Sequence, residues 1–110
     1  AHNQDGIQFL MNWLMQQHYD KQHIVIGFVN DKPLDQVLNL LPRNAHYYFV
    51  NAQLPRALKA SELKEKAALY NLRGKAYKSV KNGFLAAKKK AGKNDIIVVT
   101  GSIFVVAEVI

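Results

Sequence analysis

The sequence predicts an α/β protein with a Rossmann-like, mostly parallel sheet and helices on both faces of that sheet. Apolar runs rich in β-branched or aromatic residues, at 24–29, 45–51 and 96–99, are typical of buried strands. Segments with apolar residues at helical spacing lie between these runs. Strands that alternate with helices imply right-handed crossovers, and therefore parallel neighbours, in a doubly wound sheet.

The expected order of elements is a helix, four strands joined by three helices, and a final helix. The helices are expected at 5–18, 34–41, 61–71, 79–90 and 103–110, and the strands at 23–30, 45–51, 76–77 and 95–99. Ser79 is expected to cap its helix, and Gly74 and Gly92 are expected to follow helix ends. The helix predicted from Ser61 could also take its N-cap at Lys59 or Ala60.

Length and composition indicate one domain, residues 1–110, with a core of its own. Hydrophobic residues make up 49% of the chain, but no stretch reaches the roughly 18 consecutive apolar residues of a membrane span. Nothing in the sequence has the pattern of a signal peptide. The lack of cysteine excludes disulfides, thiolate metal sites and cysteine nucleophiles. We therefore expect a cytoplasmic protein that contacts no membrane.

The chain is basic, with a net charge of +7 from 15 basic and 8 acidic residues. Most of the lysines after residue 56 fall in expected helices, where a solvated outer face is the usual explanation. No nucleic-acid motif is present, and aromatic residues are not interleaved with the basic run at 88–93. We expect no nucleic-acid partner, although a stand-alone basic α/β module that meets an acidic partner stays an alternative.

The last sixteen residues contain the strongest local indication of a ligand site. Thr100, Gly101 and Ser102 interrupt an apolar run, so the glycine predicts a turn from the last strand into a helix. Such a turn lies at the carboxyl ends of the strands, where open α/β sheets bind ligands. Near a helix N-terminus, Ser102 would suit a carboxylate or a phosphate, although spacing alone favours a plain helix cap.

Composition and spacing supply no complete catalytic set. The chain has no phosphate-binding glycine-rich loop with lysine, no paired acid–base carboxylates and no His-x-x-x-His. Its four histidines are scattered, and each is expected to be structural or solvated from its position alone: His2, His18, His23 and His46.

Four short motifs in order resemble the C-terminal domain of folylpolyglutamate synthase, an enzyme often bifunctional with dihydrofolate synthase in the Mur ligase superfamily. They are Ala-His-Asn with Asp-Gly at 1–6, Gly-Phe-Val-Asn-Asp-Lys at 27–32, Pro-Arg-Ala at 55–57 and Thr-Gly-Ser-Ile-Phe-Val-Val at 100–106. The resemblance runs from end to end, and it departs from the family pattern at Gln4, where proline is usual. It implies a Mur ligase C-terminal domain fold. A Mur-type ligase of peptidoglycan precursors is the alternative within the superfamily.

The resemblance implies an ATP-dependent ligation of glutamate to dihydropteroate or a folate through an acyl phosphate, with ATP and Mg²⁺ held mainly by an N-terminal ATP-binding portion. By position, it places His2 beside the transferred phosphate or the incoming glutamate, and Ser102 on a glutamate carboxylate. Asn3 and Gly101 are weaker carry-overs, and neither Asp31 nor Arg56 is assigned a role. We expect an excised domain that is inactive alone and that self-associates through an unpaired sheet edge.

Overall fold

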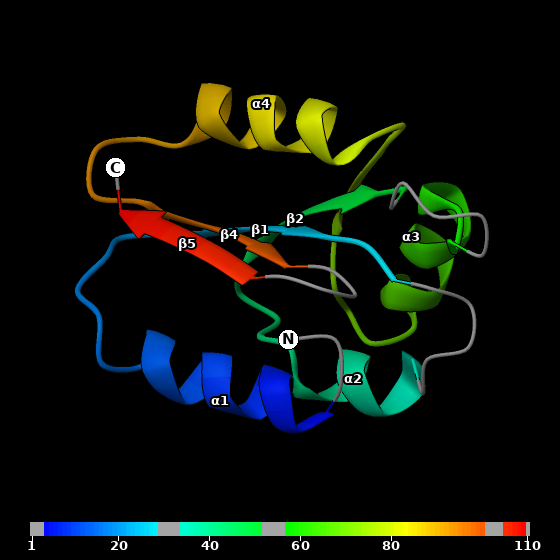
Figure 1. The fold of residues 1–110 in the computed structure, drawn as a ribbon, viewed down its shortest axis with the longest axis horizontal. Coiled ribbons are helices and arrows are strands. Elements are labelled where there is room, and N and C mark those ends of the chain that lie inside the picture. Colours follow the sequence, from blue (N-terminus) through cyan, green and yellow to red (C-terminus); the bar gives the residue numbers. More distant parts are fainter. Residues whose placement is uncertain (1–3, 29–33, 52–56, 101–104, 110) are drawn as a thin grey trace.

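The described residues form one five-stranded sheet with helices against both faces (Figure 1). The computed structural model describes residues 4–28, 34–51, 57–100 and 105–109. The helices are α1 (Gln4–Leu14), α2 (Leu34–Leu40), α3 (Ala60–Ala68) and α4 (Val80–Lys90). The strands are β1 (Gln22–Ile26), β2 (His46–Val50), β3 (Gly74–Tyr77), β4 (Ile96–Thr100) and β5 (Val105–Val109).

The strand order is β3-β2-β1-β4-β5, so the central strand is the first one in the chain. The pairs β1–β2, β2–β3 and β1–β4 are parallel, whereas β5 runs antiparallel to β4. In the centre of the sheet, Ile24 lies opposite Tyr47 on one side and Val98 on the other. The predicted α/β fold with a mostly parallel sheet and helices on both faces is therefore confirmed.

The final element differs from the prediction. Residues 105–109 form a strand on the edge of β4, whereas a helix was expected at 103–110. The five residues include three valines, and β-branched side chains favour strands over helices. An apolar run this short carries no period that separates the two possibilities. The expectation that Ser102 begins a helix fails with it, since the next element is β5.

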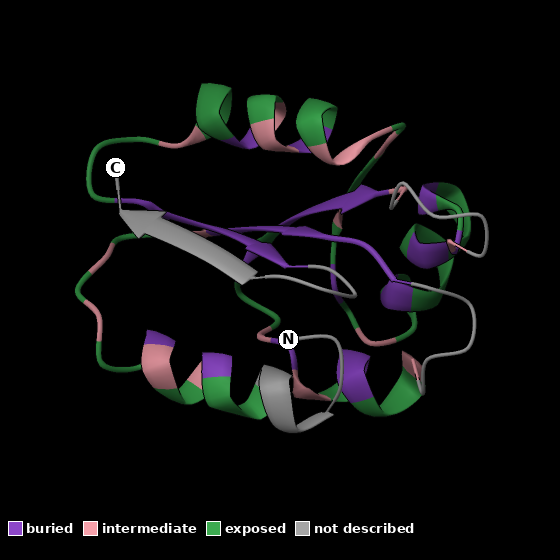
Figure 2. Ribbon diagram, viewed as in Figure 1, coloured by how far each residue is buried: buried purple, intermediate pink, exposed green. Residues whose placement is uncertain are grey.

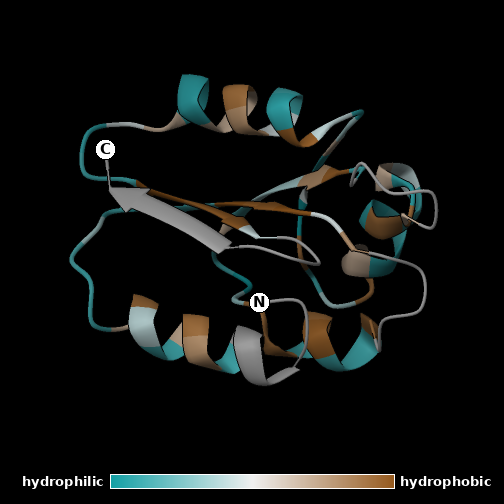
Figure 3. Ribbon diagram, in the orientation of Figure 1, coloured by the Kyte–Doolittle hydropathy of each residue, from teal (hydrophilic) through white to brown (hydrophobic). Residues whose placement is uncertain are grey.

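The two faces of the sheet contact different helices. On one face, α1, α2 and α3 enclose a core in which Leu14, Val37 and Leu63 gather with Ile24 and Phe49. Figure 2 shows β1, β2 and β4 mostly buried between these helices and α4, and Figure 3 shows that β1 and β4 are largely hydrophobic. Because both faces are covered, the central strands read as continuous apolar runs rather than as alternating ones.

The second face contacts α4 alone among the described helices. Val25, Val50 and Val99 of the sheet gather there with Ala87 and Phe84 of the helix. Gly83 allows this close approach, because a Cβ atom at that position would overlap Cγ1 of Val50 and lie 3.2 Å from Cγ1 of Val25. The helix is fixed at its start by Ser79, as predicted, whose hydroxyl accepts a hydrogen bond from the backbone N–H of Asn82 at 3.0 Å.

Some helices and strands begin or end a few residues away from the predicted positions. Helix α1 ends at Leu14 rather than at residue 18, and β3 begins at Gly74 rather than at residue 76. Of the three starts left open for α3, the structure selects Lys59 as N-cap. No helix in the described ranges has both the length and the apolar character to cross a membrane. The self-association expected from an unpaired edge stays a prediction.

Candidate functional site

The carboxyl ends of the four parallel strands meet at one edge of the sheet. Strands β1, β2, β3 and β4 end there at Ile26, Val50, Tyr77 and Thr100. Helix α1 runs back across the sheet from this edge, so its first turn also lies there (Figure 1). Open α/β sheets bind ligands at this edge, because loops and helix N-termini converge on it.

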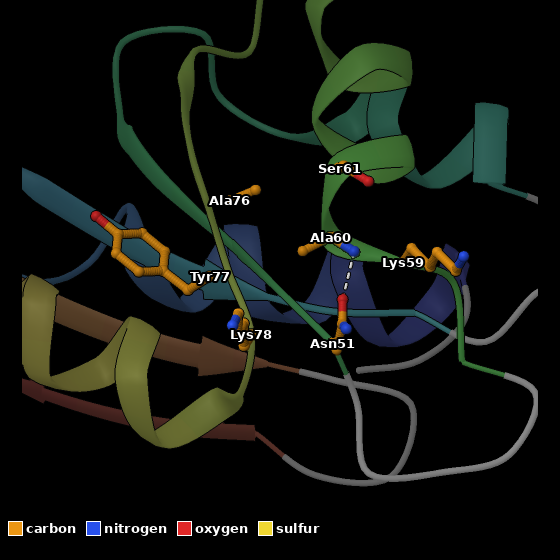
Figure 4. Close-up of a pocket in the computed structure, with 7 residues that line it drawn as sticks. All are labelled: Asn51, Lys59, Ala60, Ser61, Ala76, Tyr77 and Lys78. Atoms are coloured by element: carbon orange, nitrogen blue, oxygen red, sulfur yellow. Dashed lines mark hydrogen bonds between the residues drawn. The ribbon is translucent and has the colours of Figure 1, made fainter.

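A pocket of about 260 Å³ lies at this carboxyl edge, between the ends of β2 and β3 and the start of α3 (Figure 4). Its lining comes from three segments: Asn51 directly after β2, residues 59–61 at the start of α3, and residues 76–78 at the end of β3. We call it the carboxyl-edge pocket. It joins residues that are well separated in sequence, so only the folded sheet creates it.

Asn51 fixes the geometry of this pocket. Its side-chain oxygen accepts a hydrogen bond from the backbone N–H of Ala60, in the first turn of α3 (Figure 4). The N-cap residue Lys59 has no side-chain acceptor, so Asn51 supplies from a neighbouring strand end the partner that a capping serine or aspartate would give. The backbone N–H of Leu58 also donates to the carbonyl of Phe28 at 2.8 Å, which ties the approach to α3 to the end of β1.

The carboxyl-edge pocket has a positive electrostatic character. Lys59 and Lys78 line it, and no Asp or Glu is among the described residues of its wall. The N-terminus of α3 adds the positive end of a helix dipole, and the hydroxyl of Ser61 lies in the same first turn. These groups suit a carboxylate or a phosphate. Elsewhere in the described ranges, no group of three or more His, Cys, Asp or Glu side chains is arranged to hold a metal ion.

The site residues predicted from the sequence lie outside the described residues. They are His2, Asn3, Gly101 and Ser102, together with the unassigned Asp31 and Arg56. Their roles stay predictions. The structure does describe the chain on either side of several of them: α1 begins at Gln4, and β4 ends at Thr100. The backbone N–H of Gly27 donates to the carbonyl of Thr100 at 3.3 Å, so the segments that lead to residues 29 and 101 leave the sheet side by side.

Sequence reasoning missed Asn51, Lys59 and Lys78. Asn51 was read as the last residue of a strand, and its position directly after an apolar run was the available signal. The two lysines carried no signal of their own, because both looked like ordinary solvated cations beside expected helices. Of the histidines, His18 and His46 are exposed and His23 is buried, which agrees with the structural or solvated roles expected for them.

Comparison with known proteins assigns the chain to a family. Residues 1–103 match the family model described as "Mur ligase, glutamate ligase domain", so the chain belongs to the family of Mur ligase glutamate ligase domains. A curated relative, dihydrofolate synthase/folylpolyglutamate synthase of Buchnera aphidicola subsp. Schizaphis graminum, is 31% identical over 110 residues, which cover 98% of this chain. The resemblance to the C-terminal domain of folylpolyglutamate synthase is thereby confirmed.

Solved structures of the same enzyme class share the fold. A bifunctional folylpolyglutamate synthase/dihydrofolate synthase from Yersinia pestis, complexed with AMPPNP and Mn ion, superposes with a TM-score of 0.78 at 27% identity. Escherichia coli FolC, in complex with DHPP and ADP, superposes with a TM-score of 0.77 at 25% identity. Both alignments cover 93% of this chain and 24% of the solved one. The chain likewise spans 26% of the Buchnera relative, about a quarter of its length.

Proposed function

We propose that this chain is the C-terminal, glutamate-ligase domain of a longer, cytoplasmic, ATP-dependent folate–glutamate ligase. The observation that carries the proposal is the match of residues 1–103 to the glutamate ligase domain family, joined to 31% identity with a dihydrofolate synthase/folylpolyglutamate synthase. Because the aligned part is a quarter of that relative, we assign most of the ATP and Mg²⁺ binding to other parts of the longer enzyme.

The reaction we propose is an amide ligation in two steps. A carboxylate oxygen of dihydropteroate, or of the glutamate tail of a folate, takes the γ-phosphoryl group of ATP and releases ADP. The amine nitrogen of glutamate then attacks the acyl carbon, the C–O bond to phosphate breaks, and the amine loses a proton as the amide forms. Mg²⁺, when bound, neutralises charge on the phosphates. Each substrate and leaving group is anionic, so the protein must supply fixed positive charge where they meet.

This chain would supply part of that positive surface. His2 is proposed to lie beside the transferred phosphate or the incoming glutamate, and Ser102 to donate its hydroxyl to a glutamate carboxylate. Lys59 and Lys78 lie at the same edge of the sheet, in a pocket whose described wall carries no acid. We propose that they hold an anionic group of the substrates there. Asn51 would act indirectly, by holding the first turn of α3 in place.

A domain exchange tests the proposal. The corresponding domain of E. coli FolC is replaced by residues 1–110, and glutamate-dependent ADP release is measured with dihydropteroate as the acceptor. We expect turnover in the chimera and none from the 110-residue chain alone. Ser102→Ala in the chimera should raise the KM for glutamate. A chimera that folds and binds ATP but never consumes glutamate would refute the proposal. Turnover by the isolated 110-residue chain would refute the separate claim that the chain is inactive alone.

Single charge changes in the chimera test the carboxyl-edge pocket. Lys78→Gln and Lys59→Gln should each raise the KM of an anionic substrate about two- to fivefold, the size expected for one partly solvated ion pair. Lys64→Gln removes the same charge from an exposed position of α3 that does not line the pocket, and it should leave KM unchanged. Equal effects from all three variants would mean that net charge, not the pocket, is responsible.

A further inference from the structure

The opposite edge of the sheet contains a buried polar cluster that the proposed function does not use. At the amino ends of β1, β2 and β4, the ring of His23 lies between the carboxylate of Asp95 and the hydroxyl of Tyr48. Nε2 of His23 is 2.8 Å from Oδ2 of Asp95, and Nδ1 is 2.8 Å from the oxygen of Tyr48. The three residues are 3%, 5% and 3% exposed, so their polar atoms depend on each other.

The carboxylate of Asp95 has its hydrogen-bonding capacity filled from inside the protein. Oδ2 accepts from the backbone N–H of Gly92 at 2.9 Å as well as from His23, and Oδ1 accepts from the backbone N–H of Lys21 at 3.2 Å. The bond from Gly92 is the largest cause of a lowered pKa for Asp95, followed by the bond from His23. The carboxylate is therefore ionised at neutral pH, and one of its oxygens accepts the hydrogen bond from His23.

These bonds determine the direction of the hydrogen bond to Tyr48. An ionised carboxylate only accepts, so Nε2 of His23 carries the proton that faces Asp95. On a neutral ring, Nδ1 is then an acceptor, and the hydroxyl of Tyr48 donates to it. Burial, followed by the charges of Tyr77 and Asp95, raises the pKa of Tyr48 to about 12, so this hydroxyl stays protonated.

A cavity of about 510 Å³ opens above this cluster, at the amino edge of the sheet. The ring of His46, which is exposed, stacks on His23 with a centroid separation of 5.2 Å. Three lysines from separate segments complete the wall: Lys21 before β1, Lys90 at the end of α4, and Lys93 in the turn that leads to β4. We call this the amino-edge cavity. The described lining also contains two acids, Asp20 and the Asp95 of the cluster.

Positive charge dominates in the amino-edge cavity. The groups that face His46 from the surrounding segments are Asp20, Lys21, His23, Tyr48, Lys90, Lys93 and Asp95. The pKa of His46 is lowered by the partial loss of water around its ring and then by the charges of His23 and Lys21, and these outweigh the opposing effect of Asp95. An anion is the partner that would relieve this repulsion.

We propose that the amino-edge cavity binds a phosphate-type oxyanion, at the opposite end of the strands from the carboxyl-edge pocket. Lys21, Lys90 and Lys93 would surround the anion, and His46 would take up a proton and donate to it. Anion binding is therefore coupled to proton uptake, and this inference does not depend on the proposed function.

The sign of the coupling gives a specific expectation. Because the anion favours protonated His46, affinity must fall as pH rises, even for an anion whose own charge is constant. Sulfate keeps its double negative charge between pH 6 and pH 8, so it is the probe for the pH series. Inorganic phosphate, which changes charge in that range, is the second probe at a fixed pH.

The test is an NMR titration of the isotope-labelled 110-residue chain with sodium sulfate at constant ionic strength. We expect saturable chemical-shift changes of Gly92, Lys93 and the His46 ring at millimolar sulfate. The affinity for sulfate should be at least threefold weaker at pH 8 than at pH 6. Phosphate should produce the same pattern of shifts. The double variant K90Q/K93Q should weaken binding at least fivefold. K64Q/K66Q, which removes two exposed lysines of α3 outside the cavity, is the matched control and should bind as the parent does.

Three results would overturn the proposal. They are shifts that never saturate, equal losses in K90Q/K93Q and K64Q/K66Q, and an affinity that does not change between pH 6 and pH 8. Because all four substituted lysines are exposed, these variants keep the core intact. Activity of a chimeric ligase is not part of this readout, so failure here leaves the proposed function unaffected.

Discussion

Gly83→Ala sets two effects of known sign against each other. Gly83 lies inside α4, where alanine is the better helix former by about 1 kcal/mol. The same methyl group would overlap Cγ1 of Val50 and approach Cγ1 of Val25 to 3.2 Å. Both valines are fully buried in the sheet, so neither can move away freely. Overpacking of a dense core costs about 1–3 kcal/mol.

Two contacts at one site place the cost in the upper part of that range. After subtraction of the gain in helix propensity, we expect Gly83→Ala to lower the free energy of unfolding by about 1–2 kcal/mol. The assay is urea unfolding at pH 7, followed by circular dichroism, with an unchanged m-value as the sign that the change is in stability. If propensity alone decided the outcome, the variant would be more stable than the parent.

A double-mutant cycle with Val50→Ala identifies the cause. Val50→Ala alone removes two buried methyl groups and should cost about 1–3 kcal/mol. In the double variant, the new methyl group at residue 83 occupies the space that Val50 has left, so the total loss should be smaller than the sum by about 0.5–3 kcal/mol. Additive effects, or a stabilised Gly83→Ala single variant, would refute the close packing of α4 on β1 and β2.

Two other predictions concern single polar groups. Asn51→Ala should destabilise the chain by about 1 kcal/mol in urea unfolding, because the N–H of Ala60 loses its partner, while Ser61→Ala in the same turn should have little effect. A similar loss in both variants would contradict the cap. Asp95→Asn should cost about 1–3 kcal/mol at pH 7, because its ionised oxygens accept from His23 and two backbone N–H groups. The lowered pKa of Asp95 makes this contribution complete above the unfolded value of about 3.9, and it is lost as pH falls through the folded pKa. The stability difference between the parent and the variant should therefore narrow as pH falls below the unfolded value; a difference that stays constant down to the acid limit of folding would be inconsistent with the ionised cluster.

The sequence alone was sufficient for the architecture. The alternation of apolar strands with amphipathic helices determines the parallel sheet, because each crossover has one allowed hand and must cover a face. Residues 105–109 were the exception. A valine-rich segment that short is compatible with either a helix or a strand. The antiparallel pairing with β4 is a tertiary contact that no local pattern encodes.

The site was predictable only in its location. Strand direction alone places Thr100, the last residue of β4, at the carboxyl edge of the sheet, whereas the roles predicted for His2 and Ser102 stay predictions. The pocket residues were not predictable, since Asn51 reaches Ala60 only when α3 crosses over between β2 and β3. His23 and Asp95 give the same lesson at the other edge. They are 72 positions apart, and only the pairing of β1 with β4 brings them together.

The position of β1 in the sheet also has a consequence for how the chain is made. Its partner β4 is synthesised more than seventy residues later, as the 74-residue separation of Lys21 and Asp95 shows. During translation, β1 therefore has one edge without a partner until β4 has left the ribosome. Such an open edge is a template for intermolecular pairing. Slow folding is expected for a sheet whose central strand gains its second neighbour only through a contact this distant in sequence.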